Sequence, residues 1–141
     1  MSVVIDAGIV VALIVGDERQ AAARAHIEGW LEADEGLHAP AVLPYEIANV
    51  LARLVLDGAL EISEVDDTWR DLGALGLILH PFDLAADGHQ VATITAQLHR
   101  RHATDSSYIC LARRLGAVMW TLDGALARNA ADHRLPVRLV S

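Results

Sequence analysis

The feature of this sequence that most limits its fold is the alternation of short apolar runs with longer helical patterns. Val3-Val4-Ile5 is a β-branched run that ends at an acid, and Leu77-Ile78-Leu79 is a second apolar run of the same length. Short apolar runs of this kind are typical of buried strands in a parallel sheet. We expect further strands at Leu37–Ala39, Ala117–Thr121 and Val137–Val140.

Helical patterns fill the segments between these expected strands. Pro44 suits the first turn of a helix that runs to Leu56, and Gly116 suits the end of a helix that Thr104 caps. The apolar run Ile9–Val15 is expected to form a helix, and a capping box of Asp17 and Gln20 predicts another over Ala21–Glu35. Two more helices are expected from their capping residues, one from Ser63 and Asp66 to Gly73 and one from Asp83 to about His99–His102.

Strands that alternate with helices indicate βαβ units, in which helices cover both faces of a parallel sheet. The predicted fold class is therefore α/β, a three-layer α/β/α sandwich around a central, mostly parallel five-stranded sheet. The chain has 141 residues and nothing in it has the composition of a linker, so we expect one domain over residues 1–141. Its one cysteine, Cys110, excludes an internal disulfide.

Two observations bear on where the protein works. The longest uninterrupted apolar run, Ile9–Val15, is far too short to span a bilayer, and the first residues lack the basic and apolar regions of a signal peptide. We therefore expect a cytoplasmic protein without membrane contact.

The net charge of −8, with eleven Arg and no Lys, argues against a general nucleic-acid binder. It does not exclude a nuclease, because divalent ions bound to carboxylates offset part of this charge.

Four acids are expected to meet at one edge of the predicted sheet. In a parallel sheet with right-handed crossovers, the carboxyl ends of the strands and the starts of the crossover helices share one edge. Asp6 follows the first strand directly, and Asp123 lies two residues beyond the fourth. Glu46 and Asp105 lie in the first turns of two helices. Parts of the chain that are far apart in sequence thus converge on one acidic site.

Such a set of carboxylates predicts a divalent metal site. Two carboxylates about 4 Å apart repel by roughly 4 kcal/mol at an effective dielectric constant near 20, so four together need protons or cations. Ligands that are all oxygen favour Mg²⁺ or Mn²⁺ over zinc, which prefers His or Cys. An ion of this kind activates water and stabilises charge on a phosphate. The pattern therefore favours metal-assisted hydrolysis of a phosphodiester, with no covalent nucleophile.

Four segments resemble the motifs of the PIN-domain nucleases, and in size and pattern the VapC-type toxins of bacterial toxin–antitoxin pairs. They are Val3–Ala7, Pro44–Leu51, Thr104–Ala112 and Trp120–Asp123. The resemblance implies a PIN fold, dependence on Mg²⁺ or Mn²⁺, endonucleolytic cleavage of RNA, a homodimer, and neutralisation by an antitoxin protein. Two positions depart from the family pattern: Gly8 stands where a small hydroxyl residue is common, and Ser106 where Ala is usual.

Five further residues are candidates for supporting roles. Thr121, at the end of the fourth strand, is a candidate hydrogen-bond partner of a metal ligand or water, or simply a strand residue. Asn49 lies three residues after Glu46, on the same side of a helix, and faces either the site or solvent. The candidate RNA contacts are Arg100, Arg101 and Arg128, although Arg100 and Arg101 equally suit a helix end.

Other functions also fit a parallel sheet with an acidic edge. A receiver domain needs a lysine, which this chain lacks, and a haloacid-dehalogenase-type phosphatase needs a second Asp where Gly8 stands. His99 and His102 lack convincing zinc spacing. The alternative that stays open is a catalytically silent PIN module that acts by binding a protein partner.

Overall fold

The computed structural model describes residues 2–141 and has a central β-sheet with helices on both faces. Within these residues the sheet has five strands, all parallel, in the order β3-β2-β1-β4-β5. The expected α/β fold is confirmed, and the sheet is wholly rather than mostly parallel. The strands are β1 (Ser2–Ile5), β2 (Gly36–Pro40), β3 (Ile78–His80), β4 (Val118–Thr121) and β5 (Val137–Leu139).

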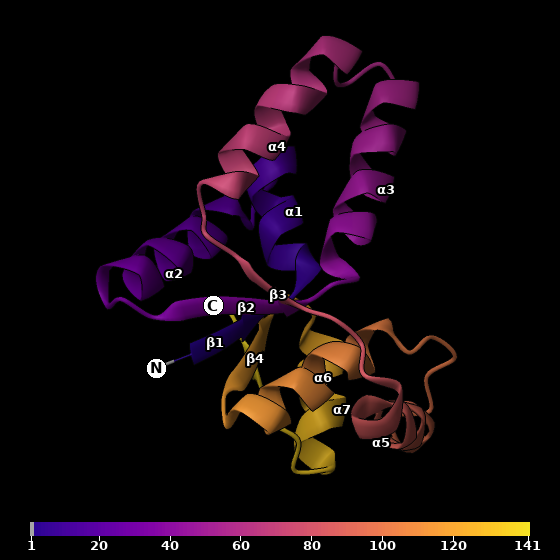
Figure 1. Cartoon of the computed structure of the whole chain (residues 1–141). Coiled ribbons are helices and arrows are strands. Elements are labelled where there is room, and N and C mark those ends of the chain that lie inside the picture. Colours follow the sequence, from indigo (N-terminus) through magenta and orange to yellow (C-terminus); the bar gives the residue numbers. More distant parts are fainter. Residues whose placement is uncertain (1) are drawn as a thin grey trace.

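Helices form two layers, one on each face of the sheet (Figure 1). The first layer follows β1 and β2 and consists of α1 (Ala7–Val15), α2 (Gln20–Glu32), α3 (Leu43–Leu56) and, after the short 3₁₀ helix η1 (Ile62–Glu64), α4 (Val65–Gly73). The second layer follows β3 and β4 and consists of α5 (Leu84–Gln97), α6 (Thr104–Leu115) and α7 (Gly124–Asp132). No helix in residues 2–141 is both long and apolar enough to cross a membrane.

The central strand β1 is the core of the molecule. It pairs with β2 and β4, with Val3 opposite both Leu37 and Val118. Val4 and Ile5 are completely buried, because α1 and α3 lie on one side of the sheet and α6 on the other. From β1 the chain builds outward in one direction through β2 and β3, and then returns to add β4 and β5 on the other side. The carboxyl ends of β1 and β4 therefore flank the point where the strand order reverses, which is where open α/β sheets bind ligands.

The predicted helices all form, but several of their ends differ from the prediction. Thr104 is the first residue of α6 and its side chain makes no capping bond; Ala103 is the N-cap. The capping box of Asp17 and Gln20 does not form either, because the Gln20 side chain donates to the carbonyl oxygen of Leu13 instead. The Asp17 carboxylate instead accepts from the backbone and side-chain N–H groups of Arg19.

Two further ends differ for reasons of local geometry. The helix α4 is preceded by η1, whose capping box is made by Glu61 and Glu64, so the expected start at Ser63 and Asp66 is wrong. The helix α5 ends at Gln97 rather than at His99–His102, because His99 adopts a left-handed conformation with φ of 53°. A residue in this conformation terminates a helix.

Candidate active site

Asp6 and Thr121 meet at the switch point of the sheet. Asp6 follows β1 directly, and its side chain caps α1 by accepting from the backbone N–H of Gly8 at 3.5 Å. Thr121 ends β4 and is completely buried. Its hydroxyl donates to Oδ2 of Asp6 at 2.8 Å, and the hydroxyl oxygen accepts from the backbone N–H of Asp123 at 3.0 Å. Thr121 thereby fixes the orientation of Asp6 and of the segment that begins α7.

Glu46 is held by a tyrosine from the opposite layer of helices. Pro44 lies in the first turn of α3, and this start places Glu46 at the same edge of the sheet as Asp6. The hydroxyl of Tyr108, a fully buried residue of α6, donates to Oε1 of Glu46 at 2.7 Å. A hydrogen bond to one carboxylate oxygen restricts the rotation of Glu46 and leaves Oε2 for another partner.

Asp105 and Asp123 share a basic neighbour. Asp105 lies in the first turn of α6, and Asp123 caps α7 by accepting from the backbone N–H of Leu126 at 3.0 Å. Arg100 lies between the two acids: its Nη1 is 3.4 Å from Oδ2 of Asp105, and its Nη2 is 4.0 Å from Oδ2 of Asp123. One guanidinium therefore links the starts of two helices.

The carboxylates are close enough to influence one another's ionisation. Burial, and secondarily the charge of Asp105, raises the pKa of Asp6, while the bonds from Thr121 and Gly8 oppose this rise. Burial also raises the pKa of Glu46, with contributions from the charges of both Asp6 and Asp105. Burial and the charge of Asp123 raise the pKa of Asp105, against the opposing charge of Arg100. The four acids, from separate elements, thus lie at one edge of the sheet, and their role as a common metal site stays a prediction.

The donor set at this edge suits a hard divalent cation. It consists of carboxylate oxygens with the Thr121 hydroxyl beside them, which is the chemistry that Mg²⁺ and Mn²⁺ prefer. Within residues 2–141, however, no three His, Cys, Asp or Glu side chains form a ready-made cage for an ion. The residues therefore fit the cation by chemistry and location, and an ion would have to draw the carboxylates closer together. We name these four acids the acidic rim: Asp6, Glu46, Asp105 and Asp123.

The supporting residues are placed unequally around the acidic rim. Asn49 lines an open pocket together with Asp6, Glu46 and Gly8, which favours the interpretation that it faces the site. The Arg128 side chain folds back so that its Nη1 lies 3.2 Å from where a Cβ on Gly124 would be, next to Asp123. Arg101, by contrast, is exposed and makes no ion pair within the part of the chain that the structure describes.

Two residues of this region were missed by the sequence analysis. Tyr108 lies three residues after Asp105, on the same side of α6, and this spacing is the signal that would have indicated it. Arg53 lines the pocket of Asp6 and Glu46. It lies four residues after Asn49 on α3, so the same helical spacing predicts that it shares that face.

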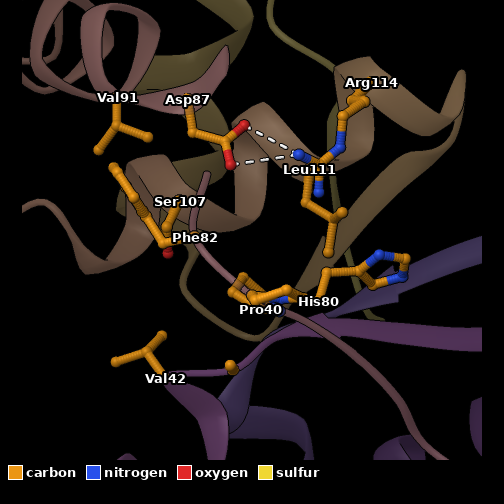
Figure 2. Close-up of a pocket in the computed structure, with 11 residues that line it drawn as sticks. Pro40, Val42, His80, Phe82, Asp87, Val91, Ser107, Leu111 and Arg114 are labelled. Atoms are coloured by element: carbon orange, nitrogen blue, oxygen red, sulfur yellow. Dashed lines mark hydrogen bonds and ion pairs between the residues drawn. The ribbon is translucent and has the colours of Figure 1, made fainter. Parts of the chain in front are cut away.

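A second pocket lies beside the ends of β2 and β3 and is mainly apolar. Figure 2 shows Phe82 and Val91 on one side of it and the ion pair of Arg114 with Asp87 at its margin, with Nη1 and Oδ1 3.0 Å apart. Its lining comprises none of the four rim acids in the described part of the chain. The pocket is therefore lined by other residues than the acidic rim.

Comparison with known proteins relates both the fold and the motifs to one family. The family model described as "PIN domain" matches residues 3–132. A Mycobacterium tuberculosis protein named "Ribonuclease VapC3" is 32% identical over 127 residues, which cover 89% of this chain and 85% of that protein. A Pyrobaculum aerophilum protein of the same name is 30% identical over 131 residues, or 92% and 95% of the two chains. The crystal structure of PAE2754 from Pyrobaculum aerophilum superimposes with a TM-score of 0.67 over 92% of this chain and 79% of that one, at 20% identity.

Proposed function

This chain belongs to the PIN-domain family and is of the VapC type, and from that membership we propose that it is a metal-dependent endoribonuclease, the toxin of a toxin–antitoxin pair. The observation that carries the proposal is that Asp6, Glu46 and Asp105, which belong to three separate elements, lie close enough for the charge of Asp105 to help raise the pKa of both Asp6 and Glu46. Carboxylates in such proximity have a shared cation as their natural partner. Relatives named as ribonucleases point to RNA as the substrate.

The four acids of the rim are the proposed ligands of Mg²⁺ or Mn²⁺. Asp6 and Asp105 are the primary candidates, because each is partly buried and each influences the ionisation of other rim acids. Asp123 lies at the open side of the rim, where its side chain also caps α7. A divalent ion, when bound here, would lower the pKa of a bound water and offset the negative charge that develops on the phosphate.

The chain's own residues would supply the proton transfer and the orientation. Tyr108 holds Oε1 of Glu46, so Oε2 is the oxygen that would border the ion and accept a proton from the water that attacks phosphorus. The raised pKa of Glu46 suits this role, since a general base works best when its pKa lies near the working pH. Attack forms one P–O bond and breaks the bond to the leaving ribose oxygen, which takes up a proton. Thr121 keeps Asp6 in one orientation throughout.

Three arginines and an asparagine are proposed to contact the RNA backbone. Arg53 and Asn49 border the pocket of Asp6 and Glu46, and Arg100 and Arg128 lie near Asp123. Arginine suits this role because its planar guanidinium can bind two phosphate oxygens at once. Arg101, which is exposed beside Arg100, stays a weaker candidate.

The cellular part of the proposal is a cytoplasmic homodimer that an antitoxin protein neutralises. Leu56 and Ile62, on either side of the turn between α3 and η1, are both exposed, and we propose that they belong to an apolar partner surface. The test is induced expression: growth should stop with the wild type and continue with Asp6→Asn. Size-exclusion chromatography with light scattering measures the oligomeric state.

The direct test of the enzyme uses purified protein with a mixed RNA substrate. We expect cleavage with Mg²⁺ or Mn²⁺, none with excess chelator, and loss of cleavage in Asp6→Asn and Asp105→Asn. Asp132→Asn is the matched control, since Asp132 is an exposed acid at the end of α7. Sequencing of the RNA ends would identify the target. Cleavage that persists in chelator rejects the mechanism, and no cleavage of any RNA favours the silent module.

A further inference from the structure

Arg100 has a position among the ion-pairing arginines that suggests a role beyond RNA contact. Within residues 2–141, the other arginines in ion pairs bind acids outside the rim: Arg19 binds Asp17, Arg70 binds Asp66 and Asp67, and Arg114 binds Asp87. Arg100 instead pairs with two rim acids, and it uses a different nitrogen for each. Its positive charge thus lies beside carboxylates that a metal ion is proposed to bind.

The backbone around Arg100 is built to hold this side chain at the rim. The N–H of His99 donates to the carbonyl of Ala96 and the N–H of Arg100 to the carbonyl of Thr95, each at 3.0 Å. These two bonds form a Schellman motif, which closes α5 and fixes the direction of the chain beyond it. The motif uses His99 at φ of 53°, a conformation that favours glycine and is costly for other residues.

A second anchor ties this turn to α7. The side-chain amide of Asn129 donates to the carbonyl oxygen of Leu98 at 3.0 Å. Since α7 begins just after Asp123, this bond couples the turn before Arg100 to the helix that presents one of its two acidic partners. The position of Arg100 is therefore determined by two elements and not by its own side chain alone.

The contacts of Arg100 with the acids are loose enough to be exchanged. Its distances to the two carboxylates are 3.4 and 4.0 Å, longer than the 2.7–2.9 Å of a strong charge-assisted hydrogen bond. Its side chain is 32% exposed, so it can turn outward without crossing the core. A divalent ion carries twice the charge of a guanidinium and repels it, and the guanidinium fork matches phosphate geometry.

We propose that Arg100 is a resident counter-cation of the acidic rim, which pairs with Asp105 and Asp123 in the metal-free protein and turns to an RNA phosphate when a divalent ion takes its place. This inference rests on the proposed function, because it assumes that the rim binds metal. Arg100 first competes with the metal ion for the carboxylates and then, once the ion is bound, contacts the substrate. A residue with a merely structural role would instead support metal binding or leave it unchanged.

The test compares Mn²⁺ binding by the full chain without RNA. Isothermal titration calorimetry with Mn²⁺ should give a Kd for Arg100→Met about five- to tenfold lower than for the wild type, because the competing charge is gone. Arg101→Met is the matched control, since it removes the adjacent exposed arginine, and it should match the wild type. Arg100→Lys keeps the charge and should stay near the wild-type Kd. Arg100→Gln repeats the neutralisation with a different side chain, in case Arg100→Met folds poorly.

The second readout is RNA cleavage at saturating Mn²⁺. Arg100→Met should raise KM severalfold with a smaller change in kcat, because the phosphate contact is lost while the metal site is filled. If the wild type binds Mn²⁺ and both neutral variants bind it equally or more weakly, Arg100 does not act as a counter-cation. If KM is unchanged, Arg100 does not turn to an RNA phosphate. If neither the wild type nor the variants bind Mn²⁺, the proposed function fails together with the inference.

Discussion

The hydroxyl of Thr121 donates a hydrogen bond of 2.8 Å to Oδ2 of Asp6, a residue 115 positions earlier in the chain. The bond joins the ends of β1 and β4, which are neighbours in the sheet although six α-helices and two strands separate them in sequence. Because the hydroxyl oxygen of Thr121 also accepts from the N–H of Asp123, one buried hydroxyl orders two acids of the rim. The acidic rim thus depends on residues that carry no charge themselves.

Removing the charge of Asp6 should strongly reduce RNA cleavage without lowering the stability of the fold. Asp6→Asn is expected to lower RNA cleavage by at least about 100-fold, beyond the 10–100-fold typical of a partner that only orients a metal ligand. Its free energy of unfolding in chelator should stay unchanged or rise, because a partly buried carboxylate near Asp105 is replaced by a neutral group that can still cap α1. Urea unfolding measures this. A large loss of stability would show that Asp6 is mainly structural.

Tyr108→Phe tests whether the orientation of Glu46 matters. The change removes a hydrogen bond of 2.7 Å from a fully buried position and should destabilise the protein by about 1.5–3 kcal/mol, as expected for a bond to a charged acceptor. Cleavage should fall about tenfold or more. Tyr45→Phe is the matched control, because Tyr45 is 74% exposed and lies next to Glu46 in the chain. If both variants cleave like the wild type, Tyr108 does not position the base.

Thr121→Val replaces the hydroxyl by a methyl group of similar size. Asp6 then loses its donor and the N–H of Asp123 loses its acceptor, so we expect a destabilisation of about 1–3 kcal/mol and a 10–100-fold weaker affinity for Mn²⁺. Calorimetric titration with Mn²⁺ measures the affinity. Thr121→Ser restores the hydroxyl and should recover most of both quantities. An equal effect of the two substitutions would indicate packing rather than hydrogen bonding.

Gly8→Ser restores a hydroxyl where the family pattern commonly has one. A Cβ at Gly8 would have Oδ2 of Asp6 at 3.9 Å as its nearest neighbour, which is ordinary contact, so the larger side chain fits. We expect a gain of up to about 0.5 kcal/mol in stability from the better helix propensity of serine. Affinity for Mn²⁺ should rise relative to Gly8→Ala, which fills the same space without a hydroxyl. Equal affinities for the two variants would show that the missing hydroxyl is unimportant.

The stability of the metal-free protein should depend on pH through the raised pKa values of Asp6, Glu46 and Asp105. In the unfolded chain these groups titrate near 3.8 and 4.5, and the folded protein holds their protons to higher pH. Their contribution to stability is therefore present below the unfolded pKa values and is lost as the pH rises through the folded ones.

Thermal melting in chelator, compared between wild type and Asp6→Asn, isolates this contribution from that of other acids. The melting temperature of the wild type should fall relative to the variant as the pH rises above about 4, the unfolded pKa of an aspartate. Excess Mn²⁺ should reverse the trend, because metal ligands bind once deprotonated. A difference that is constant with pH would contradict the raised pKa of Asp6.

Much of the site could be predicted because it depends on rules that operate along the chain. Asp6 follows an apolar run that is typical of a buried strand, and Glu46 lies two residues after the proline in the first turn of α3. Parallel strands with right-handed crossovers then require these acids to share an edge. The same rules do not give side-chain partners. The spacing of Tyr108 from Asp105 indicates a shared helix face, but no local pattern shows that its hydroxyl reaches Glu46 in the opposite layer, because that contact depends on packing distances.

The sequence by itself determined the strands, the order of layers and the edge at which the acids gather, because the periodicity of apolar residues is a local property of the chain. Only the tertiary structure decided which polar groups pair: Thr121 with Asp6, Tyr108 with Glu46, and Arg100 with Asp105 and Asp123. Tyr108 and Glu46 are 62 residues apart in the chain, and Thr121 and Asp6 are 115 residues apart. Their proximity results from the burial of the sheet between two layers of helices, which is a property of the whole fold.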